Sequence, residues 1–144
     1  MAQVSTYLNF PGTAAAAFEL YKSIFGGEYS MFMRMGDMPP HPGAPVMSDE
    51  QKQRVMHVCL PILGGHNLMA SDVPTTDEKF IVGTNIYVSL HLDSKEEVDK
   101  LFAALSEGGV VEHAPSLMFW GDYWGTTTDK FGIQWMFTFA APKN

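Results

Sequence analysis

One order of predicted elements occurs twice along this 144-residue chain, and this repeat constrains the fold more than any other feature. Alternating apolar residues predict strands, and apolar residues at helical spacing that end in paired glycines predict helices. The strand and helix patterns lie at 4–10 and 14–27 and again at 85–92 and 95–109. Phe10 closes the first strand and Leu92 closes its counterpart, an offset of 82 residues (92 − 10). The spacing therefore predicts two βαβββ modules in tandem.

A proline-rich loop accounts for the difference in length between the modules. Gly65 and Gly132, at the two hairpin turns, are only 67 residues apart (132 − 65), which is 15 fewer than the offset of the first strands. Residues 37–52 hold four prolines and no periodic pattern, so we predict a long loop that serves as a lid or a partner contact. Module one then spans 1–72 and module two spans 84–140.

Turn and cap residues mark the ends of several elements. Thr13 fits the N-cap of the first helix, and Ser94 with Glu97 three residues later predicts a capping box at the second. The segment Asp129-Lys130-Phe131-Gly132 predicts a tight turn before the last strand, closed by the Asp129 side chain. After the second helix, strand-like runs follow at 110–114, 117–124 and 133–139.

We expect an α+β fold in which each module buries one face of its sheet under its helix. The other face of each sheet is then bare, and pairing the two sheets edge to edge would form a half-open barrel with a central cleft. In the strand at 85–92, the face with Ile86, Val88 and Leu90 is expected under the helix. The face with Tyr87, Ser89 and His91 is expected to line the cleft.

Composition narrows the classes of partner and compartment. The 9 basic and 16 acidic residues give a net charge of −7, which opposes binding to nucleic acid or to anionic lipid. No apolar run approaches the roughly 18 residues of a membrane span, and the chain does not start like a signal peptide. The single cysteine, Cys59, cannot form an internal disulfide, so we expect a cytoplasmic protein with no membrane association.

Several residues are candidates for the lining of the cleft, each with a structural alternative. His57 fits a general acid or base, but it also fits a structural histidine, whereas His113 is expected at a strand start with no site role. Asp72 and Asp122 could each orient a histidine, bind a ligand hydroxyl or cap a turn. The aromatic residues near the end of the chain suit a core, a dimer interface or a ligand wall. The candidate ligand-binding residues are Tyr7, His57, Met69, Tyr87, Ser89, Trp120, Asp122, Tyr123 and Met136.

The chain resembles the vicinal oxygen chelate superfamily of glyoxalases, dioxygenases and bleomycin resistance proteins. Within it, the chain is most similar to the PhnB-like group, sometimes labelled a 3-demethylubiquinone methyltransferase domain. The segments that carry the resemblance are "YLNFPGTAAAAFELYKSIFGGE", "VMHVCL", "LMASD", "LFAALSEGG" and "FWGDYWGTTTDKFGIQW". They span nearly the whole chain. No glycine-rich loop of the kind that holds an adenosyl cofactor follows a predicted strand, so we expect no cofactor.

Metal-dependent members of the superfamily take four ligands from the first and last strands of the two modules. The resemblance places these positions at Ser5, Met69, Tyr87 and Met136. Imidazole and carboxylate groups bind zinc, nickel, iron or magnesium, whereas hydroxyls and thioethers are poor donors for these ions. We therefore expect no metal site of the usual kind.

The resemblance implies a protein that binds a small organic molecule in its cleft. It also implies a homodimer, with residues 119–124 as a candidate contact surface. The alternative is a lyase, isomerase or dioxygenase that uses His57 as acid or base, or a metal held by other residues. A third hypothesis is a fold that serves assembly alone. The hydroxyl and thioether groups at the four ligand positions separate the binding and enzymatic hypotheses, and they favour binding.

Overall fold

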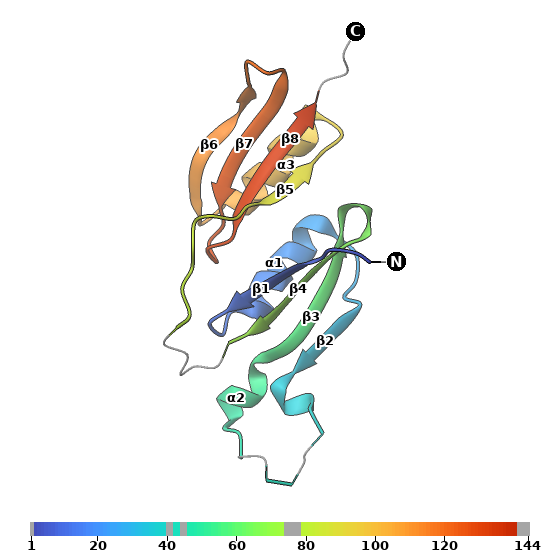
Figure 1. The fold of residues 1–144 in the computed structure, drawn as a ribbon, viewed down its shortest axis with the longest axis vertical. Coiled ribbons are helices and arrows are strands. Elements are labelled where there is room, and N and C mark those ends of the chain that lie inside the picture. Colours follow the sequence, from blue (N-terminus) through green and yellow to red (C-terminus); the bar gives the residue numbers. More distant parts are fainter. Residues whose placement is uncertain (1, 40–41, 44–45, 74–78, 141–144) are drawn as a thin grey trace. The chain divides into compact units, whose positions relative to one another are not determined.

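The computed structural model describes residues 2–39, 42–43, 46–73 and 79–140 (Figure 1). The chain divides into two compact units, Met1–Phe80 and Ile81–Asn144. Within the described residues, none of the helices combines the length and the apolar character that a membrane crossing requires.

The first unit is a four-stranded mixed sheet with one main helix. Its elements are β1 (Thr6–Phe10), α1 (Ala14–Phe25), β2 (Met31–Arg34), β3 (Val55–Ile62) and β4 (His66–Asp72). The strand order is β1-β4-β3-β2, with β1 parallel to β4 and the other neighbours antiparallel. The chain runs from β1 through α1 to β2 at the far edge of the sheet. The antiparallel strands β2, β3 and β4 then lead back, so that β4 lies beside β1.

The second unit repeats the same topology. Its elements are β5 (Val88–His91), α3 (Lys95–Ser106), β6 (Val110–Leu117), β7 (Asp122–Thr128) and β8 (Gln134–Ala140), in the order β5-β8-β7-β6. The strand pairing also repeats, because Tyr7 lies opposite Met69 and Ser89 lies opposite Met136. The two offsets found in the sequence, 82 (89 − 7) and 67 (136 − 69), thus describe equivalent positions. The prediction of an α+β fold from two βαβββ modules is confirmed.

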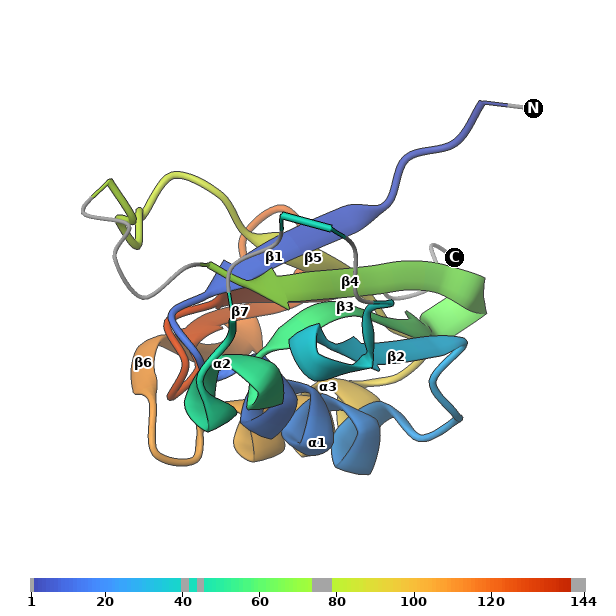
Figure 2. The same cartoon turned by 90° about the horizontal axis from the view of Figure 1, so that it is seen from below.

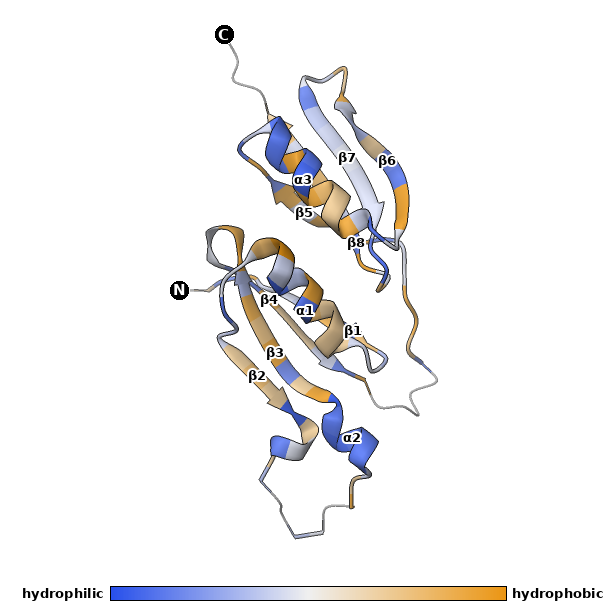
Figure 3. Ribbon diagram, turned by 180° about the vertical axis from the view of Figure 1, so that it is seen from behind, coloured by the Kyte–Doolittle hydropathy of each residue, from blue (hydrophilic) through white to orange (hydrophobic). Residues whose placement is uncertain are grey.

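Helices α1 and α3 each cover one face of the sheet in their own unit (Figures 2 and 3). In the first unit the residues under α1 include Val58, Leu60 and Leu68, and all three are buried. In the second, Trp135 and Phe137 of β8 are fully buried against the α3 side, and the rings of Phe102 and Phe137 meet edge to face. We call the opposite face of each sheet its open face.

Two predicted strands differ from those observed. The strand predicted at 85–92 is shorter, and Ile86, expected under the helix, is 74% exposed. The run predicted at 117–124 is wrong as a single strand. It contains a turn, in which the Met118 N–H donates to the Asp122 carbonyl and Gly121 adopts a φ of 101°. Gly121 is followed by β7, so the aromatic residues of this run belong to a hairpin rather than to one strand.

The predicted loop at 37–52 is wrong in its last residues. A short helix, α2 (Asp49–Gln53), forms there because Ser48 and Gln51 build a capping box, each side chain accepting the backbone N–H of the other. A single 3-10 turn, Met35–Asp37, precedes the loop. Residues 40–41 and 44–45 lie outside the described residues.

The two predicted hairpin turns are confirmed. Gly64 and Gly65, between β3 and β4, have φ values of 73° and 86°, which suit glycine. In the second unit the Asp129 carboxylate accepts the N–H groups of Phe131 and Ile133 at 2.8 and 3.0 Å. Its other oxygen accepts the indole N–H of Trp135 at 2.9 Å, so one side chain closes the turn and fixes a core residue.

The N-terminus of α1 is not capped by Thr13, whose side chain makes no capping hydrogen bond. The buried Asp72 carboxylate, at the end of β4, takes this role. Its Oδ1 accepts from the N–H groups of Gly12 and Ala14 at 3.1 and 2.9 Å, and its Oδ2 accepts from the Val55 N–H at 2.8 Å. A residue 58 positions away in sequence can therefore replace a local cap. The turn-capping alternative for Asp72 is the correct one.

The start of α3 follows the prediction more closely. The Ser94 hydroxyl accepts the N–H of Glu97 at 3.1 Å, as a cap requires. The Glu97 carboxylate, however, accepts the N–H of Asp93 rather than that of Ser94. The cap is thus confirmed, and the reciprocal bond of the box is shifted by one residue.

Replacing the Asp72 carboxylate should destabilise the first unit strongly. Asp72→Asn retains one acceptor oxygen but loses the charge and at least one of three hydrogen bonds to buried N–H groups, so we expect a loss of about 3 kcal/mol in the free energy of unfolding. Urea denaturation followed by circular dichroism measures it. The control Glu19→Gln removes an equal charge from the exposed side of α1 and should change stability by less than about 0.5 kcal/mol. Equal effects for the two variants would contradict the role given to Asp72.

Candidate functional site

The open face of the first sheet carries a row of residues in register across all four strands. Tyr7 of β1 lies opposite Met69 of β4, Met69 opposite Cys59 of β3, and Cys59 opposite Met31 of β2. Side chains directly opposite one another project to the same side of a sheet. Three of the four are sulfur-containing and adaptable in shape, so this row is apolar apart from the phenol of Tyr7.

Tyr7 reaches across β4 to contact His57 on β3. The phenol oxygen lies 3.3 Å from the imidazole Nδ1, and the two rings are stacked with centroids 5.7 Å apart. His57 lies two residues before Cys59, so alternation places it on the same face. Tyr7 remains 47% exposed. A phenol and an imidazole, both predicted as site residues, are therefore together on the open face, above Met69.

The open face of the second sheet begins with an equivalent row. Ser89 of β5 lies opposite Met136 of β8, and Met136 lies opposite Thr126 of β7. His91 is near enough for its Nε2 to lie 3.5 Å from the Ser89 hydroxyl. Compared with the first unit, this row is richer in hydroxyl groups.

The Tyr87 hydroxyl contacts the carboxylate of Glu112, a residue that was not among the predicted site residues. The hydroxyl donates to Glu112 of β6 at 2.5 Å, and Thr128 of β7 donates to the other carboxylate oxygen at 2.6 Å. The hydrogen bond to the Glu112 carboxylate raises the pKa of Tyr87, so the phenol keeps its proton. Tyr87 directly precedes β5, at one edge of the sheet, and Glu112 belongs to β6, at the other edge. Their hydrogen bond therefore crosses the open face.

An irregularity in β6 determines where Glu112 projects. Val111 lies opposite Thr127 but His113 already lies opposite Thr126, so Glu112 is an extra residue in a β-bulge. His113, to which no site role was assigned, packs its ring 4.9 Å from that of Trp124. A glutamate inside an otherwise apolar strand run was the available signal for this site, but a bulge cannot be read from strand periodicity.

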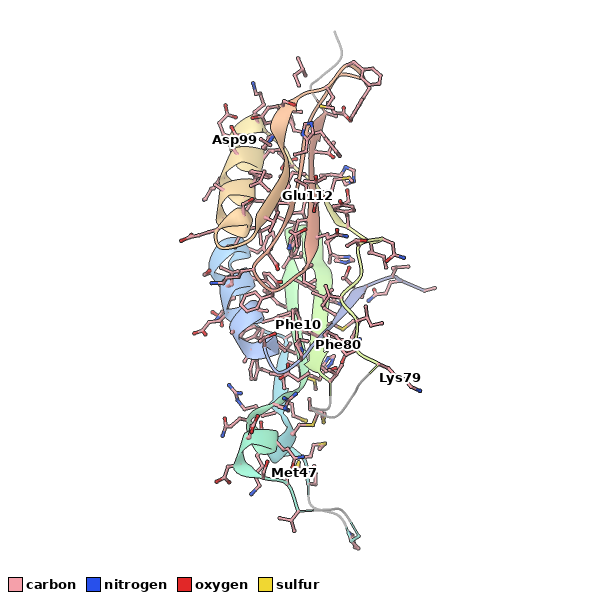
Figure 4. The ribbon with its side chains drawn as sticks, turned by 90° about the vertical axis from the view of Figure 1, so that its left-hand side faces the viewer. Phe10, Met47, Lys79, Phe80, Asp99 and Glu112 are labelled. Atoms are coloured by element: carbon pink, nitrogen blue, oxygen red, sulfur yellow. The ribbon has the colours of Figure 1, made fainter. Side chains whose placement is uncertain are left out.

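Tyr123 lies on the other side of the sheet. Its hydroxyl donates to Asp99 of α3 at 2.6 Å and Lys95 lies over its ring, 4.8 Å from the centroid. The hydrogen bond to Asp99 raises the pKa of Tyr123. Figure 4 shows Asp99 beside α3 and Glu112 beside the strands. The structure thus does not bring Tyr123 together with Ser89 and Met136.

Trp120 and Asp122 lie at the β6–β7 hairpin. The Trp120 ring meets those of Phe119 and Trp124 edge to face, with centroids 4.9 and 6.0 Å away. Phe119 is 96% exposed, so the tip of this hairpin is an apolar surface. Through Trp124, the tip adjoins the His113 side of the open face.

The positions that the resemblance assigns to metal ligands, Ser5, Met69, Tyr87 and Met136, carry hydroxyl and thioether groups. Tyr7, rather than Ser5, lies opposite Met69, and the corresponding pair in the second unit is Ser89 with Met136. Hydroxyls and thioethers are weak donors for divalent ions of zinc, nickel, iron or magnesium. Over 2–39, 42–43, 46–73 and 79–140, no three His, Cys, Asp or Glu side chains group together as metal ligands would. The donor set therefore does not fit the superfamily's ion.

Comparisons with known proteins agree with this architecture. The family model described as 3-demethylubiquinone-9 3-methyltransferase matches residues 2–138. Protein PA1353 from Pseudomonas aeruginosa is 34% identical, with a TM-score of 0.82 over 97% of this chain and 98% of that one. A PhnB protein from Bacillus cereus, described as a putative 3-demethylubiquinone-9 3-methyltransferase, is 23% identical, with a TM-score of 0.76 over 96% and 100% of the two chains.

A more distant structure shares the fold. A glyoxalase/bleomycin resistance protein/dioxygenase family enzyme from Burkholderia phytofirmans is 17% identical, with a TM-score of 0.59 over 94% of this chain and 97% of that one. At this identity the likeness concerns the fold alone. It supports the same pair of βαβββ modules.

The methyltransferase description implies an adenosyl cofactor, and the starts of α1 and α3 do not fit one. Such cofactors use a glycine-rich turn whose free N–H groups open a helix. At α1 the N–H groups of Gly12 and Ala14 already bind the Asp72 carboxylate, and at α3 that of Glu97 binds Ser94. The fold and the full-length match nonetheless determine the classification. The chain belongs to the family described as 3-demethylubiquinone-9 3-methyltransferase.

Proposed function

We propose that this protein binds a small organic molecule on the open faces of its sheets, without the metal of the wider superfamily. The observation that carries the proposal is the contact between Tyr7 and His57 above Met69. It places two hydrogen-bonding rings on an apolar surface, and such a combination of a few polar groups with apolar lining is typical of ligand sites.

The chemistry of the first open face suits a ring-shaped or apolar ligand. Met69 and Met31 offer adaptable sulfur contacts on either side of the buried Cys59, and the half-exposed Tyr7 offers a ring for stacking. The hydrogen bond between Tyr7 and His57 would orient both groups before a ligand arrives. Pre-organised polar groups lower the entropy that a ligand must lose on binding.

A second candidate function is catalysis by His57 as general acid or base. The contact with the Tyr7 hydroxyl favours it, because a positioned phenol fixes the tautomer of an imidazole and can relay a proton. A lyase or isomerase reaction would use such a pair. Catalysis and binding would use the same face, and turnover of a bound molecule distinguishes them.

Tyr7 and His57 should be required for a bound small molecule. Native mass spectrometry of the protein mixed with a cell metabolite extract should show a mass adduct on the wild type. His57→Ala should remove the adduct. Tyr7→Phe retains the ring but loses one hydrogen bond worth about 1 kcal/mol, so occupancy should fall severalfold.

Tyr29→Phe is the matched control, because it removes a phenol hydroxyl that lies between α1 and β2, outside both strand rows of the site. It should bind like the wild type. An adduct that survives in His57→Ala, or that is lost equally in Tyr29→Phe, would place the ligand elsewhere.

Purified protein should carry well below one divalent ion per chain. Met69 and Met136 at the centres of the two rows would have to supply ligands, and thioethers do not hold these ions. A chelator should therefore leave the melting temperature unchanged. Elemental analysis that finds one nickel, zinc, iron or manganese ion per chain, lost in His57→Ala, would instead support the metal-assisted enzyme.

We also propose a homodimer, supported by the exposed apolar hairpin tip with Phe119 and Trp120. Light scattering should give about twice the chain mass of 15.9 kDa. The double variant Phe119→Ser with Trp120→Ser should shift the mass toward the monomer. A wild-type monomer at high micromolar concentration would argue against this surface as an interface.

A further inference from the structure

We propose that the open face of the second sheet recognises a positively charged nitrogen, such as a protonated amine attached to a flat aromatic ring. This inference rests on the proposed ligand-binding function and specifies the class of ligand. Its basis is the cluster of Glu112, His113, Tyr87 and Thr128, which we call the β6 acceptor cluster. Among the described residues, its hydrogen-bond partners are hydroxyl groups and a backbone carbonyl, all of them neutral.

The β-bulge brings two acceptor side chains to one side of the sheet. In a regular strand Glu112 and His113 would project to opposite faces. His113 lies opposite Thr126, which adjoins Met136 on the open face, and Glu112, the extra residue of the bulge, turns to the same side, where Thr128 donates to its carboxylate. A bulge at this place thus changes which groups a ligand would meet.

Hydrogen bonds hold the Glu112 carboxylate in place and leave some of its oxygen lone pairs unused. Tyr87 and Thr128 each donate to a different oxygen, at 2.5 and 2.6 Å. A carboxylate oxygen has two lone pairs, so each oxygen can accept one further hydrogen bond. Glu112 is exposed, and its free lone pairs are available to an N–H donor from outside.

His113 also presents an acceptor. Its Nδ1 lies 2.9 Å from the Ala114 carbonyl oxygen, and a carbonyl can only accept, so Nδ1 carries the proton. In the neutral ring Nε2 is then the acceptor. Glu112 and His113 together are complementary to a ligand that donates rather than accepts.

The described cations of this unit lie elsewhere. Lys95 and Lys100 belong to α3, on the covered side of the sheet, and Lys95 packs over the Tyr123 ring. Lys130 lies in the β7–β8 turn and packs over Phe131. An anionic ligand would therefore meet the Glu112 charge without compensation, whereas a cation would be attracted.

Aromatic rings beside the cluster favour the same class of ligand. The rings of His113 and Trp124 are 4.9 Å apart on the open face, and the Tyr87 ring borders the carboxylate. Faces of tryptophan and tyrosine attract cations as well as flat rings. A planar amine can use both the rings and the carboxylate.

Three acridines of similar shape and different charge test the inference by isothermal titration calorimetry. Aminoacridine is a cation at neutral pH, acridone is uncharged, and acridine carboxylate is an anion. We expect aminoacridine to bind wild-type protein at least tenfold more tightly than acridone, and acridine carboxylate to bind most weakly. Glu112→Gln should reduce the preference for the cation to less than threefold while leaving acridone binding unchanged.

Two further variants keep this test decisive. Glu107→Gln removes the same charge from the exposed end of α3 and should leave the preference intact. Thr128→Val leaves Glu112 charged but without one of its two donors, so it should weaken aminoacridine binding severalfold even if Glu112→Gln fails to fold. Circular dichroism confirms the fold of each variant.

The outcomes separate this inference from the proposed function. Acridone binding as tightly as aminoacridine, or equal losses in Glu112→Gln and Glu107→Gln, would overturn the recognition of a cation and leave ligand binding in place. If none of the three acridines binds the wild type, the ligand site on the second sheet is refuted, whereas the proposed function stands or falls with the adduct that requires Tyr7 and His57.

Discussion

The first unit depends on one buried carboxylate. Asp72 accepts hydrogen bonds from the turn before α1, from the first residue of that helix and from the first residue of β3. These segments are distant in sequence, and a single side chain at the end of β4 sets their separation. Because α1 can bury its apolar side only if it starts at the correct place over the sheet, the covered face follows from this interaction. The open face, with Tyr7 opposite Met69, follows from the same register.

The second unit reaches the same topology with a different device. Asp129, within the turn between β7 and β8, closes that turn and holds the indole of Trp135. The two aspartates do not occupy equivalent positions in the repeat. The βαβββ architecture is thus compatible with more than one way of satisfying its buried N–H groups, which permits the two modules to diverge in sequence.

Divergence has also given the open faces different chemistry. In each unit a tyrosine in or next to an edge strand extends across the open face. The hydroxyl of Tyr7 contacts the imidazole of His57, whereas that of Tyr87 contacts the carboxylate of Glu112. Met69 and Met136, at equivalent positions, are the feature that the two faces share. The two units thus share a scaffold and differ in the polar groups on their open faces.

The sequence by itself determined the repeated order of elements, the hairpin glycines and the side of each first strand that faces away from the helix. These depend on local periodicity and turn chemistry, so Tyr7, Met69, Ser89 and Met136 could be placed on open faces in advance. Tertiary structure alone decided three other matters. Asp72 replaces Thr13 as the cap because long-range contacts can satisfy N–H groups better than a local side chain. Tyr123 contacts α3, and the β6 bulge brings Glu112 onto the open face. The positions of these two side chains depend on neighbouring strands and helices, so the periodicity of the sequence could not predict them.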